Sequence, residues 1–336
     1  MNRFLAFFLV AGLAALTGCN KPADSSSGGG SGGGKKLTIA LLPKSKGNAY
    51  FISCRKGADK AAKELGDEVI FDGPTDPDPA KQNEIVENWI TLGVDVIAAA
   101  CENKEGISTA LRKAKAKGIK VITYDADSLP DARDFFVNQA TPQGIGYALM
   151  DEGARLCGNE GEFAIITGSL TAANQIEWCK YVKERCAGKY PSMKLDALRP
   201  CDDLKDKAQS ETTTLLSAYP NLKLIINTTS LGVPGAAEAI KQAGKAGKVK
   251  NLGLGLPNEN RRYIKDGVTD CVILWKTEDL GYLTVYVADA LAKGALKPGA
   301  KSIKAGALGD FQIEGDNVML GKPFIFNKDN IDQFDF

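Results

Sequence analysis

The chain has 336 residues, which is enough for two domains with well-buried cores. Its 42 basic and 41 acidic residues give a formal net charge of +1, a balance that does not favour nucleic acid or another polyanion as a partner. Histidine is absent, which excludes His-based catalytic triads, His zinc sites and His general-base chemistry.

The N-terminus has the pattern of an export signal. Arg3 precedes the apolar run Leu5–Leu16, which is shorter than the roughly 20 residues that a membrane-spanning helix needs but is typical of a signal peptide. The run ends in Leu16-Thr17-Gly18-Cys19, which resembles the lipobox of bacterial lipoproteins. We therefore expect a lipoprotein signal peptide over residues 1–18 and a lipid anchor on Cys19. An ordinary secretory signal with a chance cysteine is the alternative.

Residues 19–36 are expected to form the lipidated cysteine and a flexible tether, because the sequence SSSGGGSGGG cannot bury a core. Export also places the remaining cysteines where disulfides persist. The candidate pairs are Cys54 with Cys101 and Cys186 with Cys201, and buried free thiols are the alternative.

The folded part begins with a strand over Leu37–Leu42, a polar turn and a helix that opens at Tyr50-Phe51. This order predicts the first β-loop-α unit of a parallel α/β domain. Ligands of such sheets bind outside the carboxyl ends of the strands. Lys44, Tyr50 and Phe51 are therefore expected at the mouth of a site.

Strands and helices then alternate in two series. Strands are predicted over residues 68–71, 94–100, 120–124, 134–137, 162–167, 194–198, 222–227, 248–254 and 270–275, with two short strands near 311–313 and 324–326. Helices are predicted over residues 80–92, 107–117, 143–156, 206–218, 233–243, 258–265 and 279–291, and a loop with a helix over 168–186. Two successive runs of five β/α units predict two doubly wound lobes that face each other.

Several short motifs occur in a fixed order along residues 37–336. They are Pro43-Lys44, Asp72-Gly73-Pro74-Thr75, Thr123-Tyr124-Asp125-Ala126-Asp127, Asn138-Gln139-Ala140-Thr141-Pro142, Asn174-Gln175 before Trp178, Pro257-Asn258, Leu274-Trp275, residues 285–291 and residues 326–330. Together they resemble the ribose-binding-protein-like periplasmic solute receptors of ABC transporters, which have the type I fold. Within that family the resemblance is to the autoinducer-2 and rhamnose receptor branch.

This resemblance implies an α/β fold of two Rossmann-like lobes joined by a hinge of three crossovers, near residues 140, 275 and 325. It divides the chain into an N-terminal lobe of residues 37–140 and 276–323 and a C-terminal lobe of residues 141–275 and 324–336. It also implies a receptor outside the cytoplasm that closes on a sugar, delivers it to a permease with its ATPase, uses no cofactor and performs no reaction. We expect a monomer.

Asp125 is the first candidate for ligand binding, because one carboxylate can accept from two hydroxyl groups of a sugar. A loop aspartate or a helix N-cap is the alternative, and Asp127 is expected to cap or support. Lys44 matches the ligand-contacting lysine of the family. A solvated lysine in a turn is the alternative. We expect the ring faces of the sugar to pack against Tyr50, Phe51 and Trp275. The alternative is that these aromatic residues are ordinary core residues.

The candidate site departs from the autoinducer-2 receptors at several positions. Asn174 stands where they have aspartate, whereas the adjacent Gln175 matches, and Lys276 stands where an acidic residue is expected. Thr228 and Ser230 bring hydroxyl groups to positions where the receptors have proline and alanine. Mismatched buried polar groups discriminate strongly, so a monosaccharide, such as a rhamnose-like deoxyhexose or a pentose, is favoured. An autoinducer-2 receptor, a chemoreceptor partner that senses sugar without transport, and a sugar-modifying enzyme are the alternatives.

Overall fold

The computed structural model describes residues 35–336, and residues 36–336 form one compact unit. The predicted signal peptide, the lipidation of Cys19 and almost all of the tether lie outside the described residues. Within residues 35–336, no helix combines the length and the hydrophobicity that a membrane span requires.

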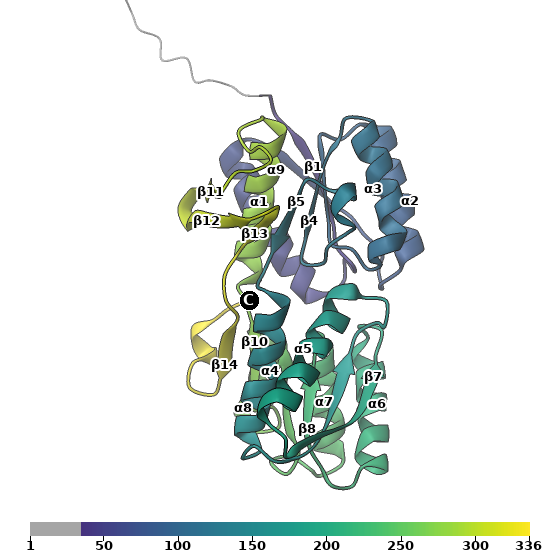
Figure 1. Ribbon diagram of the computed structural model, residues 1–336, viewed down its shortest axis with the longest axis vertical. Coiled ribbons are helices and arrows are strands. Elements are labelled where there is room, and N and C mark those ends of the chain that lie inside the picture. Colours follow the sequence, from purple (N-terminus) through teal and green to yellow (C-terminus); the bar gives the residue numbers. More distant parts are fainter. Residues whose placement is uncertain (1–34) are drawn as a thin grey trace, which may run out of the picture. The chain divides into compact units, whose positions relative to one another are not determined.

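Two sheets of mostly parallel strands organise this unit (Figure 1). The larger sheet has the order β11-β12-β13-β5-β4-β3-β1-β2. Its strands are β1 (Thr38–Leu42), β2 (Glu68–Phe71), β3 (Val96–Ala99), β4 (Lys120–Tyr124), β5 (Phe135–Asn138), β11 (Ser302–Ala305), β12 (Gly309–Glu314) and β13 (Asn317–Met319). The smaller sheet has the order β14-β10-β9-β8-β6-β7. Its strands are β6 (Gly161–Thr167), β7 (Met193–Pro200), β8 (Leu222–Asn227), β9 (Lys250–Leu254), β10 (Cys271–Leu274) and β14 (Phe324–Asn327).

Helices cover both faces of each sheet. They are α1 (Ala49–Leu65), α2 (Pro79–Leu92), α3 (Lys104–Ala116), α4 (Pro142–Leu156), α5 (Ala173–Lys189), α6 (Lys205–Ala218), α7 (Gly232–Gln242), α8 (Pro257–Lys265) and α9 (Thr277–Ala292). The side chains of β1 alternate between two cores, because Ile39 and Leu41 pack with α1 and α9 whereas Ala40 and Leu42 pack with α2 and α3. We call the larger sheet with α1, α2, α3 and α9 lobe one, and the smaller sheet with α4 to α8 lobe two.

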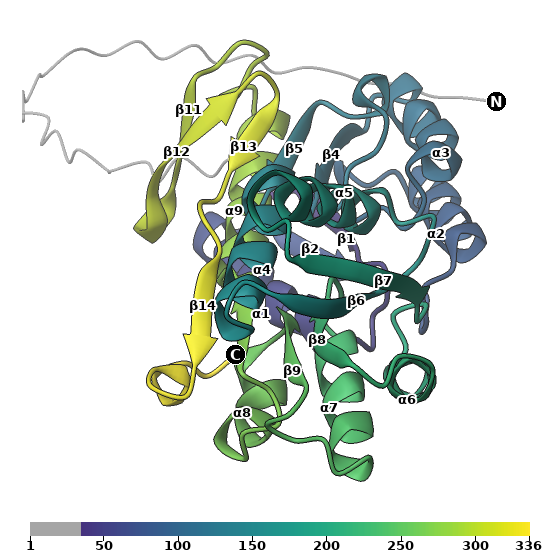
Figure 2. The same ribbon diagram turned by 60° about the horizontal axis from the view of Figure 1, so that its bottom comes forward.

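The predicted class, two doubly wound lobes with three crossovers, is confirmed. The chain passes between the sheets after β5, after β10 and after β13, and Figure 2 shows the last passage, from β13 to β14. The apolar runs predicted the strands of both series because a central parallel strand is buried on both faces. The strands β2, β4 and β8 span the predicted residues.

The end of the chain contains more strands than we predicted. Between α9 and β14 the structure has β11, β12 and β13, where the sequence indicated one short strand near 311–313. Strands β11 and β12 pair antiparallel, and β13 extends the larger sheet beside β5. Lysine and glycine residues interrupt the apolar pattern here, and β13 has three residues, so its pairing with β12 and β5 identifies it as a strand.

The seven cysteines of the described chain are all free thiols, six of them buried and Cys157 half-buried. Neither of the two candidate disulfides forms in the structure. Burial raises the pKa of Cys101 and of Cys54, which keeps both thiols protonated and unreactive at neutral pH.

Candidate ligand-binding site

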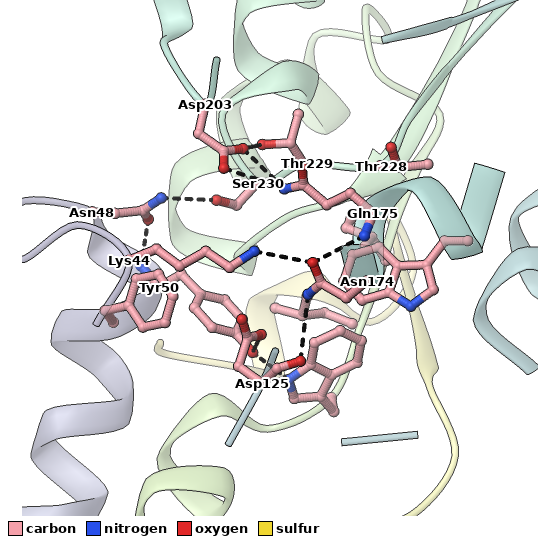
Figure 3. A pocket seen from close by; sticks show the side chains of 15 residues that line it. Lys44, Asn48, Tyr50, Asp125, Asn174, Gln175, Asp203, Thr228, Thr229 and Ser230 are labelled. Atoms are coloured by element: carbon pink, nitrogen blue, oxygen red, sulfur yellow. Dashed lines mark hydrogen bonds between the residues drawn. The ribbon is translucent and has the colours of Figure 1, made fainter. Parts of the chain in front are cut away.

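A cavity lies where loops from both lobes meet (Figure 3). It is lined by nine of the ten predicted ligand residues, namely Lys44, Tyr50, Phe51, Asp125, Asn174, Gln175, Thr228, Ser230 and Trp275. These side chains follow strands or begin helices, as expected for the carboxyl edges of parallel sheets. Their roles in binding stay predictions.

The wall from lobe one is built around Asp125, which follows β4 in the left-handed backbone region (φ 60°). Tyr50 Oη donates to Asp125 Oδ1 at 2.8 Å, and Trp275 Nε1 donates to Tyr50 Oη at 2.9 Å. The indole N–H thus directs the phenol proton toward the carboxylate. Gln139 Nε2 donates to the main-chain carbonyl of Asp125 at 3.0 Å and holds its backbone.

Lys44 is a buried cation in this wall, only 3% exposed. Burial lowers the pKa of Lys44, but the charges of Glu102, Asp125 and Asp203 outweigh this effect and raise it overall. The ammonium group therefore stays charged. Burial raises the pKa of Asp125, while the charge of Lys44 and the hydrogen bond from Tyr50 oppose that rise.

Hydrogen bonds join lobe one to lobe two around the cavity, three of them through Asn174 and Asn48 (Figure 3). Lys44 Nζ donates to Asn174 Oδ1 at 3.0 Å, and Asn174 Nδ2 donates to the carbonyl of Asp125 at 3.4 Å. Asn48 Nδ2 donates to Ser230 Oγ at 3.3 Å. The loops of both lobes are therefore in direct contact.

Aromatic rings form one side of the cavity. Tyr50 meets Phe51 edge to face at 5.0 Å between ring centroids and meets Trp275 in the same way at 6.2 Å. The ring centroids of Trp178 and Trp275 are 6.3 Å apart. Phe51 and Trp275 are both about 4% exposed, so they belong to the core and also line the cavity.

Asp127 is the one predicted ligand residue that does not line this cavity. Its carboxylate accepts from Arg133 Nε and from an Arg133 terminal nitrogen, both at 2.9 Å, and from Thr123 Oγ1 at 2.5 Å. These bonds fix the loop that carries Asp125. The supporting role of Asp127 stays a prediction.

The cavity is also lined by residues that we did not predict, among them Asn48, Trp178, Asp203 and Thr229. Asp203 follows β7 and could have been found by the rule that found Asp125, because both aspartates follow a strand of a parallel sheet. The predicted strand over residues 194–198 ended too early to show this. Asp203 accepts from Gln175 Nε2 at 3.1 and 3.2 Å and from Thr229 Oγ1.

Glu102 is a second acidic residue that we did not predict. It follows β3 and is 2% exposed, and its Oε2 atom has no hydrogen-bond partner among residues 35–336. Burial raises the pKa of Glu102 to about 6, against the opposing charge of Lys44. Over the same residues, no group of three or more His, Cys, Asp or Glu could hold a metal ion.

Comparisons with known proteins agree with this geometry. A family model described as a periplasmic binding protein domain matches residues 39–296. The chain is 29% identical to the D-ribose/D-allose-binding protein of Pseudomonas aeruginosa over 280 residues, which cover 80% of this chain and 85% of the relative.

Two solved structures have the same fold over most of their length. One is an ABC transporter solute binding protein from Clostridium phytofermentas with bound L-rhamnose, with 31% identity, a TM-score of 0.86 and coverage of 89% of this chain and 98% of that chain. The other is LsrB from Clostridium saccharobutylicum in complex with AI-2, with 26% identity, a TM-score of 0.86 and coverage of 89% and 100%.

Proposed function

The chain belongs to the periplasmic binding protein family, and from this premise we propose that it is a receptor that closes around a monosaccharide for an ABC transporter. The observation that carries the proposal is the cavity itself. A buried carboxylate at Asp125 and a buried ammonium at Lys44 stand beside the rings of Tyr50 and Trp275. This combination suits a sugar, whose hydroxyl groups need charged partners and whose ring faces need apolar walls.

The proposed ligand is a rhamnose-like deoxyhexose or a pentose. Relatives with bound L-rhamnose or named for D-ribose and D-allose support this class. The hydroxyl groups of Thr228 and Ser230 and the amide of Asn174 support a sugar over autoinducer-2. The second candidate is autoinducer-2, which the similarity to LsrB with bound AI-2 favours. The third candidate function for the same site is a receptor that senses a sugar without taking part in its transport.

Binding is proposed to proceed by hinge closure without chemistry. The lobes, proposed to be residues 37–140 with 276–323 and residues 141–275 with 324–336, would rotate about the three crossovers. A ligand favours the closed form only through contacts that the open form lacks, and here residues from both lobes surround the cavity. The relatives are binding proteins, which supports a receptor that is not an enzyme.

The receptor is proposed to act outside the cytoplasm as a monomer, held to the membrane by a lipid on Cys19 and serving a permease with its ATPase. The lipobox-like sequence before Cys19 supports the anchor. Cys19→Ser should move the protein from the membrane fraction to the soluble fraction. A variant that stays with the membrane would contradict the anchor.

A thermal-shift screen of residues 35–336 tests the function. The panel would contain L-rhamnose, D-ribose, D-allose, D-arabinose and autoinducer-2. A true ligand at 100 times its dissociation constant should stabilise the protein by about 2.7 kcal/mol. Asp125→Ala should abolish the shift, whereas Asp310→Ala, at an exposed carboxylate in β12, should keep it.

The screen has two outcomes that contradict the proposal in different ways. A shift with autoinducer-2 and with no sugar would establish the second candidate. A shift that survives in Asp125→Ala would leave the receptor standing and overturn the assigned site.

A further inference from the structure

We infer that Asp203 is the ligand-contacting carboxylate of lobe two, that Gln175 positions it, and that Asp203 and Asp125 together restrict the cavity to uncharged polyols and exclude sugar acids. This inference deepens the proposed function and rests on it. Asp203, which we did not predict, becomes a ligand contact. Gln175, which we predicted as a ligand contact, becomes a positioning residue.

Asp203 is held in an unusual conformation at the edge of the cavity. Both Asp202 and Asp203 have φ 52°, which is uncommon outside glycine. Asp202 is exposed, whereas Asp203 is 8% exposed and lines the cavity. Gly168 makes room for this arrangement, because a Cβ atom there would lie 2.4 Å from Asp203 Oδ1 and 2.3 Å from Gln175 Oε1.

The side-chain amide of Gln175 forms its hydrogen bonds with partners inside lobe two. Its Oε1 atom accepts from the main-chain N–H of Ser169 at 3.1 Å, and its Nε2 atom donates to both oxygens of Asp203. An amide has two donors and one acceptor oxygen. The two oxygens of one carboxylate lie close together, so a single N–H of Gln175 reaches both of them. The observed contacts of Gln175 therefore orient Asp203, and its second N–H is left over.

The carboxylate of Asp203 keeps capacity to accept. A carboxylate has about four lone-pair sites. Gln175 uses one on each oxygen, and Thr229 uses another on Oδ1, which leaves Oδ2 able to accept again. Among residues 35–336, the carboxylate of Asp125 accepts a side-chain hydrogen bond only from Tyr50, on Oδ1. The cavity thus has an acceptor carboxylate on each lobe, with the ammonium of Lys44 as the donor (Figure 3).

The balance of charge argues against an anionic ligand. The charged side chains that line the cavity are Lys44, Asp125 and Asp203, so carboxylates outnumber cations by one. The buried carboxyl of Glu102, beside Lys44, adds a further acidic group. A buried charge without a partner is costly, and like charges brought together suppress the wrong ligand. A sugar acid would bring a third or fourth carboxylate to a single ammonium.

The test measures binding by calorimetry with the full chain in detergent. The probes are L-rhamnose and D-allose, each compared with the pyranose uronate that carries a carboxylate at C6 and with the uncharged uronamide of similar size. D-ribose serves as a neutral sugar only, because its pyranose ring has no C6 to oxidise. The uronate should bind at least about 100-fold more weakly than the sugar, whereas the uronamide should bind comparably to the sugar. The uronamide separates the effect of charge from the effect of size.

Three variants separate contact from positioning. Asp203→Asn should weaken binding of the neutral sugar by about 10-fold or more and should reduce the discrimination against the uronate. Gln175→Ala should weaken sugar binding but should retain that discrimination, because the charge of Asp203 remains. Asp202→Asn is the matched control, since this neighbour has the same φ but an exposed side chain, and it should bind as the unaltered chain does.

The outcomes distinguish this inference from the proposed function. A uronate that binds the unaltered chain as tightly as its neutral sugar would overturn the charge selection, and this comparison requires no variant. An Asp203→Asn variant with unchanged affinity would overturn the contact. In both cases the sugar receptor stands. If no probe binds the unaltered chain, the proposed function falls and this inference falls with it.

Discussion

The buried side chain of Gln82 holds together two loops of lobe one. Gln82 is fully buried, and its Nε2 atom donates to the carbonyls of Pro43 at 2.9 Å and of Ala100 at 2.8 Å. Its Oε1 atom accepts from the N–H of Glu102 at 3.0 Å. One amide thus joins the loop after β1, which carries Lys44, to the loop after β3, which carries Glu102.

The buried carboxyl of Glu102 should make stability depend on pH. Its pKa rises to about 6 in the folded chain, from an ordinary 4.5. Between about pH 4.5 and about pH 6, the folded protein therefore retains a proton on Glu102 that the unfolded chain releases. The resulting stabilisation is complete below about pH 4.5 and is lost as the pH rises through about 6. A shift of this size corresponds to about 2 kcal/mol at most.

Glu102→Gln removes the titrating group. The unfolding free energy of this variant, measured by urea denaturation from about pH 4.5 to about pH 7, should rise relative to the unaltered chain by up to about 2 kcal/mol over the window. Glu314→Gln, at an exposed position in β12, should show no such trend. A constant difference between Glu102→Gln and the unaltered chain would exclude Glu102 as the titrating group.

Helices α1 and α9 are the elements that align the aromatic wall. Each contributes a glycine to a very close contact: a Cβ atom at Gly57 would lie 1.8 Å from the carbonyl oxygen of Glu278, and one at Gly281 would lie 1.8 Å from that of Cys54. Tyr50 lies in the first turn of α1, and Trp275 precedes α9. The close packing of the two helices therefore sets the hydrogen bond between these rings.

Gly57→Ala and Gly281→Ala should each destabilise the protein by about 2 kcal/mol or more, because the clash is with backbone and cannot be relieved by a side-chain rotation. Each should also weaken sugar binding by displacing Tyr50 from Trp275. The control is Gly188→Ala in α5, where a Cβ atom would meet nothing within 4 Å. That change should be neutral or stabilise by up to about 1 kcal/mol.

Urea unfolding and calorimetry would measure both effects. Equal stability of Gly57→Ala and Gly188→Ala would show that α1 and α9 can separate without cost. Loss of stability without loss of affinity would show that the helix contact does not align the rings.

For the whole molecule, the bonds between the lobes determine how readily the cavity opens. Asn174 takes part in two of the hydrogen bonds that join the lobes at the cavity, with Lys44 and with the carbonyl of Asp125. The chain passes between the lobes at three places, which suits a rotation about a common hinge. A sugar that contacts both lobes should shift the population toward the closed form.

Small-angle X-ray scattering of residues 35–336 should detect this shift. With a saturating sugar, the scattering curve should match that calculated from the structure, and without sugar the radius of gyration should be larger. Asn174→Ala should enlarge the ligand-free radius further, whereas Thr213→Ala, at an exposed position in α6, should not change it. Identical curves with and without sugar would contradict hinge closure.

Much of the fold and part of the site followed from local pattern. The strands of both lobes were predictable because strands buried on both faces leave short apolar runs between helices, as in β3 and β8. Lys44 and Asp125 were predictable because they follow β1 and β4, at the edge of the sheet where ligands bind. The strand β13 was not predicted, because its three residues are too few to show a pattern of their own and it is held in the sheet by pairing with β12 and β5.

The sequence by itself therefore determined the two α/β series and the loops that carry the candidate site. Only the tertiary structure decided which polar groups meet. Lys44 reaches Asn174 across 130 residues, and Gln175 reaches Asp203 across 28. Such pairings depend on how the two lobes approach and on the left-handed backbone at Asp203. Neither is encoded in local periodicity, because periodicity specifies which face of an element is buried and not which residue lies opposite.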